Sequence, residues 1–192
     1  MRIRNLTAAI VALGLSAPAL AGEYNLTVDR VEIDTGNFTK TGIGYNGATP
    51  GPVLRFKEGE DVVINVTNNL DEDTSVHWHG IRIDNAMDGV PYLTQDPVQP
   101  GETFRYDFAL PDAGTYWYHS HNRSFEQVAR GLYGALIVEE AEAPDVDADE
   151  VLVLDDWRVD PQTEQVAEPF GAFHDLSHAG RIGNYVTTNG IY

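Results

Sequence analysis

Four of the six histidines of the chain fall into two short His-x-His pairs. The pairs are His77 and His79 in VHWHG, and His119 and His121 in WYHSH. In an extended strand, alternate side chains point to the same face, so each pair is expected to present two imidazoles on one side of a strand. The intervening Trp78 and Ser120 would point to the opposite side.

Histidine clusters of this kind predict a metal site. Imidazole binds zinc, copper, iron and nickel, and the absence of cysteine excludes a thiolate ligand and a cysteine nucleophile. Histidines two positions apart on a strand have Cα atoms about 6–7 Å apart, so each pair can serve one metal ion or two neighbouring ions. The spacing by itself leaves zinc and copper open.

The elements that must position these histidines read as strands. Residues 23–140 alternate apolar and polar side chains over short runs such as DVVINVTNNL and TFRYDFAL, separated by Gly, Pro and Asn turn clusters. Seven or eight such strands with little helical periodicity predict an all-β antiparallel sandwich or barrel. We expect Trp78, Trp117 and Tyr118 to face away from the metal and to pack in the core behind the histidines.

The first residues predict export from the cytoplasm. A basic MRIRN, a ten-residue apolar run and a small-x-small site at Ala19-Leu20-Ala21 indicate a secretory signal peptide over residues 1–21. The apolar run is too short for a spanning helix, and no other run approaches membrane length, so no membrane span is expected. The predicted location is periplasmic or secreted. The net charge of −18 excludes a nucleic-acid partner, because phosphate would be repelled.

The remaining chain is expected to form one domain and the beginning of another. Residues 22–140 would form the first domain, and residues 141–150, within the acid-rich EEAEAPDVDADE, an extended linker. Residues 151–192 are too few for an independent core, which favours a fragment of a longer protein over an abnormal end. In this last segment His174 and His178 are spaced i, i+4 and are interpreted as structural or surface residues.

Several motifs together resemble the first cupredoxin domain of the multicopper oxidases, the laccase and ferroxidase family. They are YNGATPGPVLRFKEGEDVVINVTNNL, HWHG, MDGVPYLTQDPVQPGETFRYDF, GTYWYHSH and GLYGALIV, which cover most of residues 45–140. The resemblance implies a cupredoxin-like Greek-key β-sandwich, followed by the first strands of a second cupredoxin-like domain.

The resemblance also implies a role for each histidine in a trinuclear copper cluster. His77 would bind the type 2 copper, His79 and His119 one type 3 copper, and His121 the other. These are half of the eight histidines that the family uses. Asp88 in MDGVP matches the family's acidic residue near the cluster and is a possible proton relay, although an Asp-Gly turn explains it equally well.

By this resemblance the chain is part of an enzyme that couples one-electron oxidation of a phenol or metal ion to four-electron reduction of O₂ to water. The partners would be O₂, a small reducing substrate and a missing C-terminal cupredoxin domain, supplied in cis or by another subunit. The chain has no cysteine for a type 1 copper site, so alone it is expected to be inactive. Two alternatives stay open: a non-catalytic periplasmic copper-binding module, and a zinc site on a sandwich scaffold.

Overall fold

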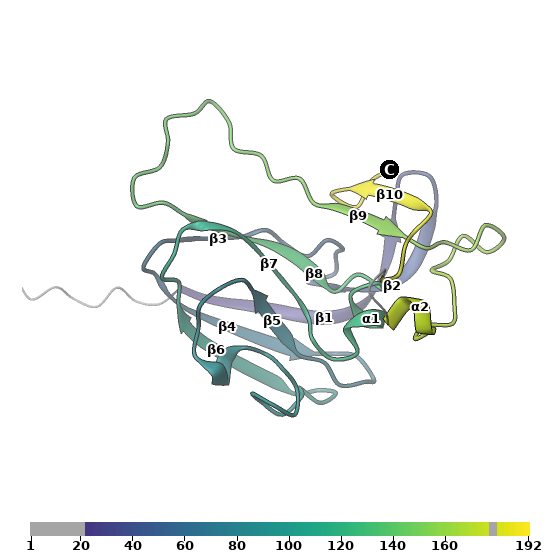
Figure 1. The fold of residues 1–192 in the computed structure, drawn as a ribbon, viewed down its shortest axis with the longest axis horizontal. Helices are drawn as coiled ribbons and strands as arrows, with labels where there is room; N and C mark the ends of the chain where they lie inside the picture. Colours follow the sequence, from purple (N-terminus) through teal and green to yellow (C-terminus); the bar gives the residue numbers. More distant parts are fainter. Residues whose placement is uncertain (1–21, 177–179) are drawn as a thin grey trace, which may run out of the picture.

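The computed structural model describes residues 22–176 and 180–192. The predicted signal peptide and His178 lie outside these residues. The described chain is built from ten strands and three one-turn helices, in an order that confirms the predicted all-β class (Figure 1). Among the described residues, no helix combines the length and the apolar character needed to cross a membrane.

The first sheet has the strand order β2-β1-β4-β6. Its strands are β1 (Gly22–Asp34), β2 (Thr39–Tyr45), β4 (Asp61–Asn68) and β6 (Thr103–Ala109). Strand β1 is antiparallel to β2 and parallel to β4, and β4 is antiparallel to β6. In β4 the alternate residues Val62, Ile64 and Val66 are all buried, because this central strand turns one face to the second sheet.

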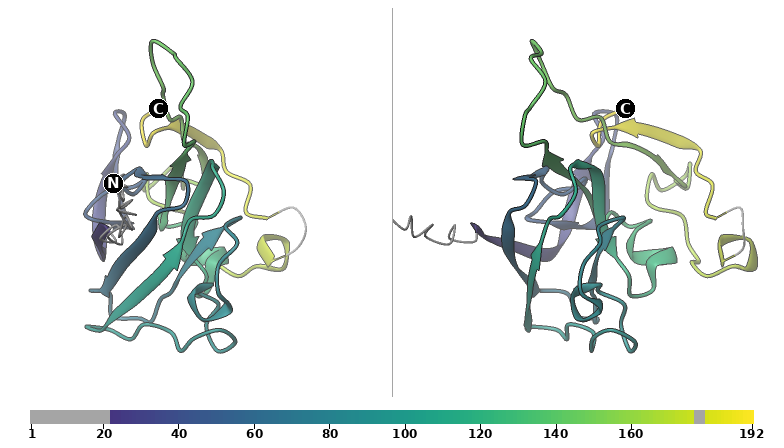
Figure 2. Two further views of the ribbon diagram at one scale, coloured as in Figure 1. Left: turned by 90° about the vertical axis from the view of Figure 1, so that its left-hand side faces the viewer. Right: turned by 60° about the vertical axis from the view of Figure 1, so that its left-hand side comes forward.

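The second sheet has the strand order β3-β8-β7-β5 and carries both histidine pairs. Its strands are β3 (Leu54–Lys57), β8 (Tyr133–Glu139), β7 (Gly114–Ser120) and β5 (Val76–His79). Strands β5 and β7 are antiparallel neighbours, although β6 lies between them in the sequence. The two sheets pack face to face as layers of a sandwich (Figure 2).

Aromatic side chains fill the space between the layers. Trp78 of β5 contacts Tyr106 and Phe108 of the opposite sheet, with ring centres 5.2 Å apart in each case. Trp78, Tyr106 and Tyr118 are fully buried. Burial of this much apolar surface on the reverse of β5 and β7 anchors the two strands that carry the histidines.

The longest connection of the second sheet is the loop between β5 and β6. It contains a 3-10 turn, η1 (Asn85–Met87), and a backbone bridge joins its residue Val98 to Thr74, just before β5. A second short helix, α1 (Ser124–Gln127), lies in the loop that follows β7. Helix α1 contacts β7, and η1 contacts β6.

Residues beyond β8 leave the sandwich and return to it. Residues 141–150 are exposed and contain neither helix nor strand, and they make the wide green arc in Figure 1. Strands β9 (Leu154–Trp157) and β10 (Tyr185–Thr188) then form a two-stranded antiparallel sheet, with α2 (Phe173–Leu176) between them. The boundaries of the first domain (22–140), the linker (141–150) and the last segment (151–192) stay predictions.

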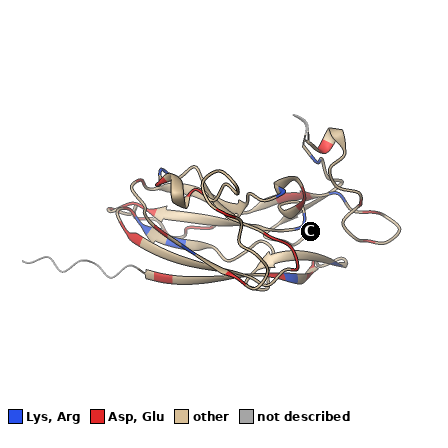
Figure 3. Cartoon of the chain, turned by 90° about the horizontal axis from the view of Figure 1, so that it is seen from below, with Lys and Arg blue, Asp and Glu red and all other residues tan. Residues whose placement is uncertain are grey.

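A second apolar cluster joins this last segment to the sandwich. It contains Val31 and Ile33 of β1, Tyr133 of β8, and Trp157, Val159 and Val166. The β9–β10 sheet therefore lies beside the far end of β1 and β2 rather than beside the histidines (Figures 1 and 2). Asp and Glu are spread over strands and loops of both layers, with few Lys and Arg between them (Figure 3).

Candidate metal centre

The register between β5 and β7 brings the two histidine pairs to the same face of the second sheet. His77 lies directly opposite His119, and His79 lies opposite Trp117. Directly opposed residues in an antiparallel pair point to the same face, with Cβ atoms about 5 Å apart. The expectation that Trp78 and Ser120 point to the other side is confirmed, since both are fully buried.

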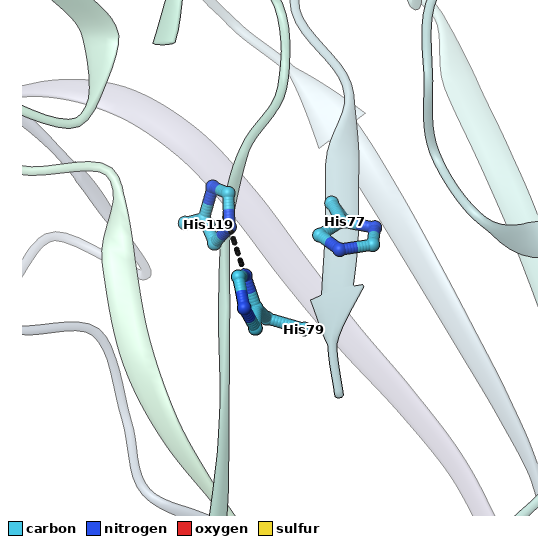
Figure 4. Close-up of side chains that lie close together, drawn as sticks. All are labelled: His77, His79 and His119. Carbon is cyan, nitrogen blue, oxygen red and sulfur yellow. Dashed lines mark hydrogen bonds between the residues drawn. The ribbon is translucent and has the colours of Figure 1, made fainter. Parts of the chain in front are cut away.

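Three of the four imidazoles form a compact group. One ring nitrogen from each of His77, His79 and His119 lies within 4.8 Å of the other two. The ring centres are 5.3 to 5.4 Å apart. Figure 4 shows His77 and His79 projecting from β5 toward His119 on β7. Nitrogens at this separation can contact a common metal ion or neighbouring ions.

His121 lies beside this group but not within it. It follows the end of β7, and its ring centre is 5.3 Å from that of His77 and 6.2 Å from that of His119. The structure therefore brings all four predicted ligands into one neighbourhood, with His121 at its margin. His174, in α2 on the segment after β9, is not one of the group.

Backbone carbonyl groups orient two of the imidazoles. Nδ1 of His77 lies 2.7 Å from the carbonyl oxygen of Asp88, and Nδ1 of His119 lies 2.8 Å from the carbonyl oxygen of Ser120. A carbonyl oxygen only accepts, so each Nδ1 carries the proton and each Nε2 keeps its lone pair for a ligand contact. This is the usual way in which a protein fixes the tautomer of a metal-binding histidine.

His79 completes the arrangement through a ring-to-ring hydrogen bond. Its Nδ1 lies 3.1 Å from Nε2 of His119, as the dashed line in Figure 4 marks. Because Nε2 of His119 is the acceptor, Nδ1 of His79 is the donor and its Nε2 is unprotonated. His77 and His79 therefore each present a free basic nitrogen, while the Nε2 lone pair of His119 accepts this hydrogen bond and would exchange it for a metal contact.

The electrostatics of the group favour a neutral imidazole at His79 and at His119. The pKa of His119 is lowered to about 4, chiefly by burial; the hydrogen bond to the Ser120 carbonyl opposes this shift, and the neighbouring histidines add to it. Burial, and then the nearby imidazoles of His77 and His121, lower the pKa of His79 as well. A neutral imidazole is the form that binds a metal, so these shifts prepare the site for a cation at neutral pH.

The loop after β5 closes over His77. The carboxylate Oδ1 of Asp88 lies 3.5 Å from Nδ1 of His77, in addition to the contact of its carbonyl. Gly89 has a φ of +77°, and a Cβ at this position would lie 1.8 Å from the carbonyl oxygen of Val76. Glycine therefore permits both the turn and the close approach of the loop to β5. Asp88 therefore takes part in the turn and also lies beside His77.

The prediction that Trp117 packs in the core is wrong. Trp117 is 39% exposed and lies on the histidine face, with its ring centre 4.1 Å from that of His119 and 4.9 Å from that of His79. The reason is strand alternation, since Trp117 and His119 are two positions apart and must share a face. The same alternation, applied to the sequence, could have found this contact. The predictions for Trp78 and Tyr118 are confirmed, because both are buried.

The donor set fits copper. The group offers neutral nitrogen donors of intermediate softness and no thiolate, and divalent copper binds such donors more tightly than the other first-row divalent ions do. Zinc accepts the same donors, so the geometry alone does not separate the two metals.

Comparison with known proteins identifies relatives that share the fold and the motif region. The family model described as multicopper oxidase matches residues 25–143. Copper resistance protein A of Pseudomonas syringae pv. tomato is 42% identical over 137 residues, which cover 70% of this chain and 22% of that protein. Laccase-2 of Botryotinia fuckeliana is 42% identical over 139 residues, covering 70% of this chain and 24% of that protein.

Solved structures agree with the sequence comparison. A multi-copper oxidase from Pseudomonas thermotolerans superposes with a TM-score of 0.84 at 39% identity, over 90% of this chain and 42% of that one. The chain thus spans about a quarter of the length of the curated relatives it matches. These likenesses confirm the cupredoxin-like sandwich.

Proposed function

The chain belongs to the multicopper oxidase family, and we propose that it supplies half of the ligands of a trinuclear copper cluster that reduces O₂ to water. The observation that carries this proposal is the convergence of His77, His79 and His119 on one face, with ligand nitrogens within 4.8 Å of one another. A core histidine with a purely structural role would have no need of two such neighbours.

The roles of the individual histidines follow the family pattern. His77 would hold the type 2 copper, while His79 and His119 would hold one type 3 copper. The short contact between the rings of His79 and His119 supports a shared ion for these two. His121 would hold the other type 3 copper, and its place at the margin of the group supports a separate ion.

Bound copper would supply the one-electron redox chemistry that the side chains of this chain lack. The chain's own residues would bind the copper and orient the imidazoles. The Asp88 carbonyl holds the proton of His77 on Nδ1, and the Asp88 carboxylate lies close enough to hold a proton at the edge of the site. We propose Asp88 as a proton relay for O₂ reduction, a role for which its 35% exposed side chain also has access to solvent.

Completion of the site requires more protein. Four further histidines and a type 1 copper site would come from a C-terminal cupredoxin domain, in cis or from another subunit. The chain contains no cysteine for a type 1 site, so electrons from a phenol or a metal ion would enter through that domain. The amino-terminal signal pattern supports a periplasmic or secreted location for the assembly.

The test is substitution in a protein that contains both halves of the cluster. His119→Ala is expected to abolish O₂ consumption while the colour of the type 1 copper remains. His174→Ala is the matched control, because His174 is a histidine outside the group. Undiminished O₂ consumption by His119→Ala would refute the ligand assignment.

A second candidate is a copper-binding module without catalysis. It is favoured by the fact that three imidazoles of this chain alone lie close enough for one ion. Metal analysis of the purified chain distinguishes it: about one copper per chain, with no O₂ consumption after a C-terminal cupredoxin domain is added, supports the module. Retention of zinc against equimolar copper would reject both copper proposals.

A further inference from the structure

A buried polar network lies behind the histidines, on the reverse side of β7. Its members Thr74, Ser120 and Gln127 are all fully buried. Oε1 of Gln127 accepts hydrogen bonds from Oγ1 of Thr74 at 2.8 Å and from Oγ of Ser120 at 2.5 Å. Nε2 of Gln127 donates to the carbonyl oxygen of Asp73 at 2.9 Å. Buried amides and hydroxyls are costly unless they are paired, so this Thr74–Ser120–Gln127 network is held together strongly.

The network joins the two chain segments that carry the histidines. Thr74 is three residues before His77, at the entrance to β5, and Ser120 stands between His119 and His121 at the end of β7. The side chain of Gln127 thus links the start of one ligand strand to the end of the other. Among the described hydrogen bonds, Gln127 is the only side chain of α1 that bonds to both of these segments.

Ser120 also controls the backbone around His121. Its hydroxyl oxygen accepts a hydrogen bond from the backbone N–H of Asn122 at 3.2 Å, and Nδ2 of Asn122 donates to the carbonyl of Asp73 at 2.7 Å. His121 is therefore held between two residues that are both bound to the entrance of β5. Loss of the network would displace His121, because its two neighbours in the chain, Ser120 and Asn122, would lose hydrogen bonds.

Helix α1 presents Gln127 in a fixed orientation. The backbone N–H of Gln127 donates to Arg123 at 3.0 Å, and its carbonyl accepts from Leu132 at 3.0 Å. Glu126 forms ion pairs with both Arg123 and Arg130, which brace the single turn. The amide is thus constrained at the backbone as well as at the side chain.

We propose that Gln127 is a positioning residue of the copper centre, which fixes the relative placement of the two histidine pairs through Thr74 and Ser120. This inference rests on the proposed function for the identity of the metal. The positioning itself concerns only the chain's own residues and can be measured without metal.

Gln127→Leu removes the network at nearly constant volume, and Thr74→Val removes one of its bonds with an isosteric side chain. Each variant is expected to bind Cu²⁺ about tenfold more weakly than the unaltered chain, which is the smallest loss typical of removing a direct partner of a metal ligand, because the network acts on the histidines through Thr74 and Ser120. Thr74→Ser keeps the hydroxyl and is expected to restore most of the affinity. In the absence of metal, the amide of Asn122 should exchange its hydrogen faster in Gln127→Leu.

Thr187→Val is the matched control. Thr187 is a buried hydroxyl of β10 that accepts a hydrogen bond from the indole N–H of Trp157 in β9, away from β5 and β7. It should lower the melting temperature without changing Cu²⁺ affinity or the exchange at Asn122. If Gln127→Leu and Thr74→Val bind Cu²⁺ as the unaltered chain does and Asn122 exchanges normally, the positioning role is refuted. If the unaltered chain binds no Cu²⁺, the proposed function fails, while hydrogen exchange at Asn122 still decides the role of Gln127.

Discussion

The indole of Trp117 is stacked on the imidazole of His119, with ring centres 4.1 Å apart and planes inclined by 28°. The same indole lies 4.9 Å from the ring of His79, which is its direct partner across the strands. One aromatic side chain thus contacts both histidines assigned to the same ion. It restricts the rotation of two rings that strand geometry alone would leave free about their side-chain torsions.

Trp117→Ala is expected to weaken Cu²⁺ binding about fivefold, because an aromatic stack is worth about 1 kcal/mol beyond its buried area. Trp117→Phe retains a ring and should recover most of the affinity. Isothermal titration with Cu²⁺ measures both. Tyr116→Ala is the control: Tyr116 is the adjacent aromatic residue on the opposite face of β7, packed against the core, so its loss should reduce stability and leave the affinity unchanged. Equal affinities for Trp117→Ala and the unaltered chain would contradict the orienting role.

Gly89→Ala is expected to lower the free energy of unfolding by at least about 2 kcal/mol and to weaken copper binding. The added Cβ would collide with the carbonyl of Val76, and relief of the clash would move the Asp88 carbonyl away from His77. Denaturant unfolding provides the measurement. Gly101→Ala isolates the backbone effect, since Gly101 has a similar φ of +81° with nothing within 4 Å of the added atom. If both variants lost the same stability, the clash would be of no importance.

Asp88→Asn separates the two functions of Asp88. The carbonyl that orients His77 is unchanged, so Cu²⁺ affinity should stay within about threefold, less than the cost of losing a histidine partner outright. The carboxylate is lost, so O₂ reduction in the complete protein should slow by about tenfold or more, with an altered pH profile. Oxygen-electrode rates between pH 5 and 8 provide the test. An unaltered rate would mean that Asp88 acts only as a turn residue.

Lys40→Met is expected to stabilise the chain at neutral pH. Lys40 is fully buried against the indole of Trp157, and no hydrogen-bond partner for its Nζ is found among the described residues. Burial lowers its pKa to about 6, against a smaller opposing effect of Asp155. The unfolded chain therefore binds a proton that the folded chain rejects between about pH 6 and pH 10.5. The loss in the free energy of unfolding that Lys40 causes is largest at low pH and diminishes as pH rises.

The melting temperature of Lys40→Met should thus exceed that of the unaltered chain by several degrees at pH 7, and the difference should shrink toward pH 10. Calorimetry at the two pH values measures it. Lys57→Met is a control on an exposed lysine of β3 and should show neither effect. A difference that grew with pH would contradict the assigned direction of the pKa shift.

Much of the fold and the centre of the site could be predicted from local pattern. Alternation of apolar residues predicted the strands, and the two His-x-His pairs predicted imidazoles on a common face. Gln127 and Lys40 could not be predicted, because their environments arise from contacts with residues 53 and 117 positions away. Trp117 was within reach of strand alternation, but the expectation that a tryptophan belongs in a core overrode it.

The pairing of His77 with His119 has a consequence for how the chain can vary in length. Inserting or deleting a single residue within β5 or β7 would reverse every following side chain and turn imidazoles into the aromatic core. The loop between Gly80 and Glu102, by contrast, can change length without altering that parity, provided that Asp88 and Gly89 keep their distance from β5. Related proteins and engineered variants should therefore differ in length there, and the two His-x-His motifs should tolerate exchange of the residue between the histidines but never a change in the number of residues.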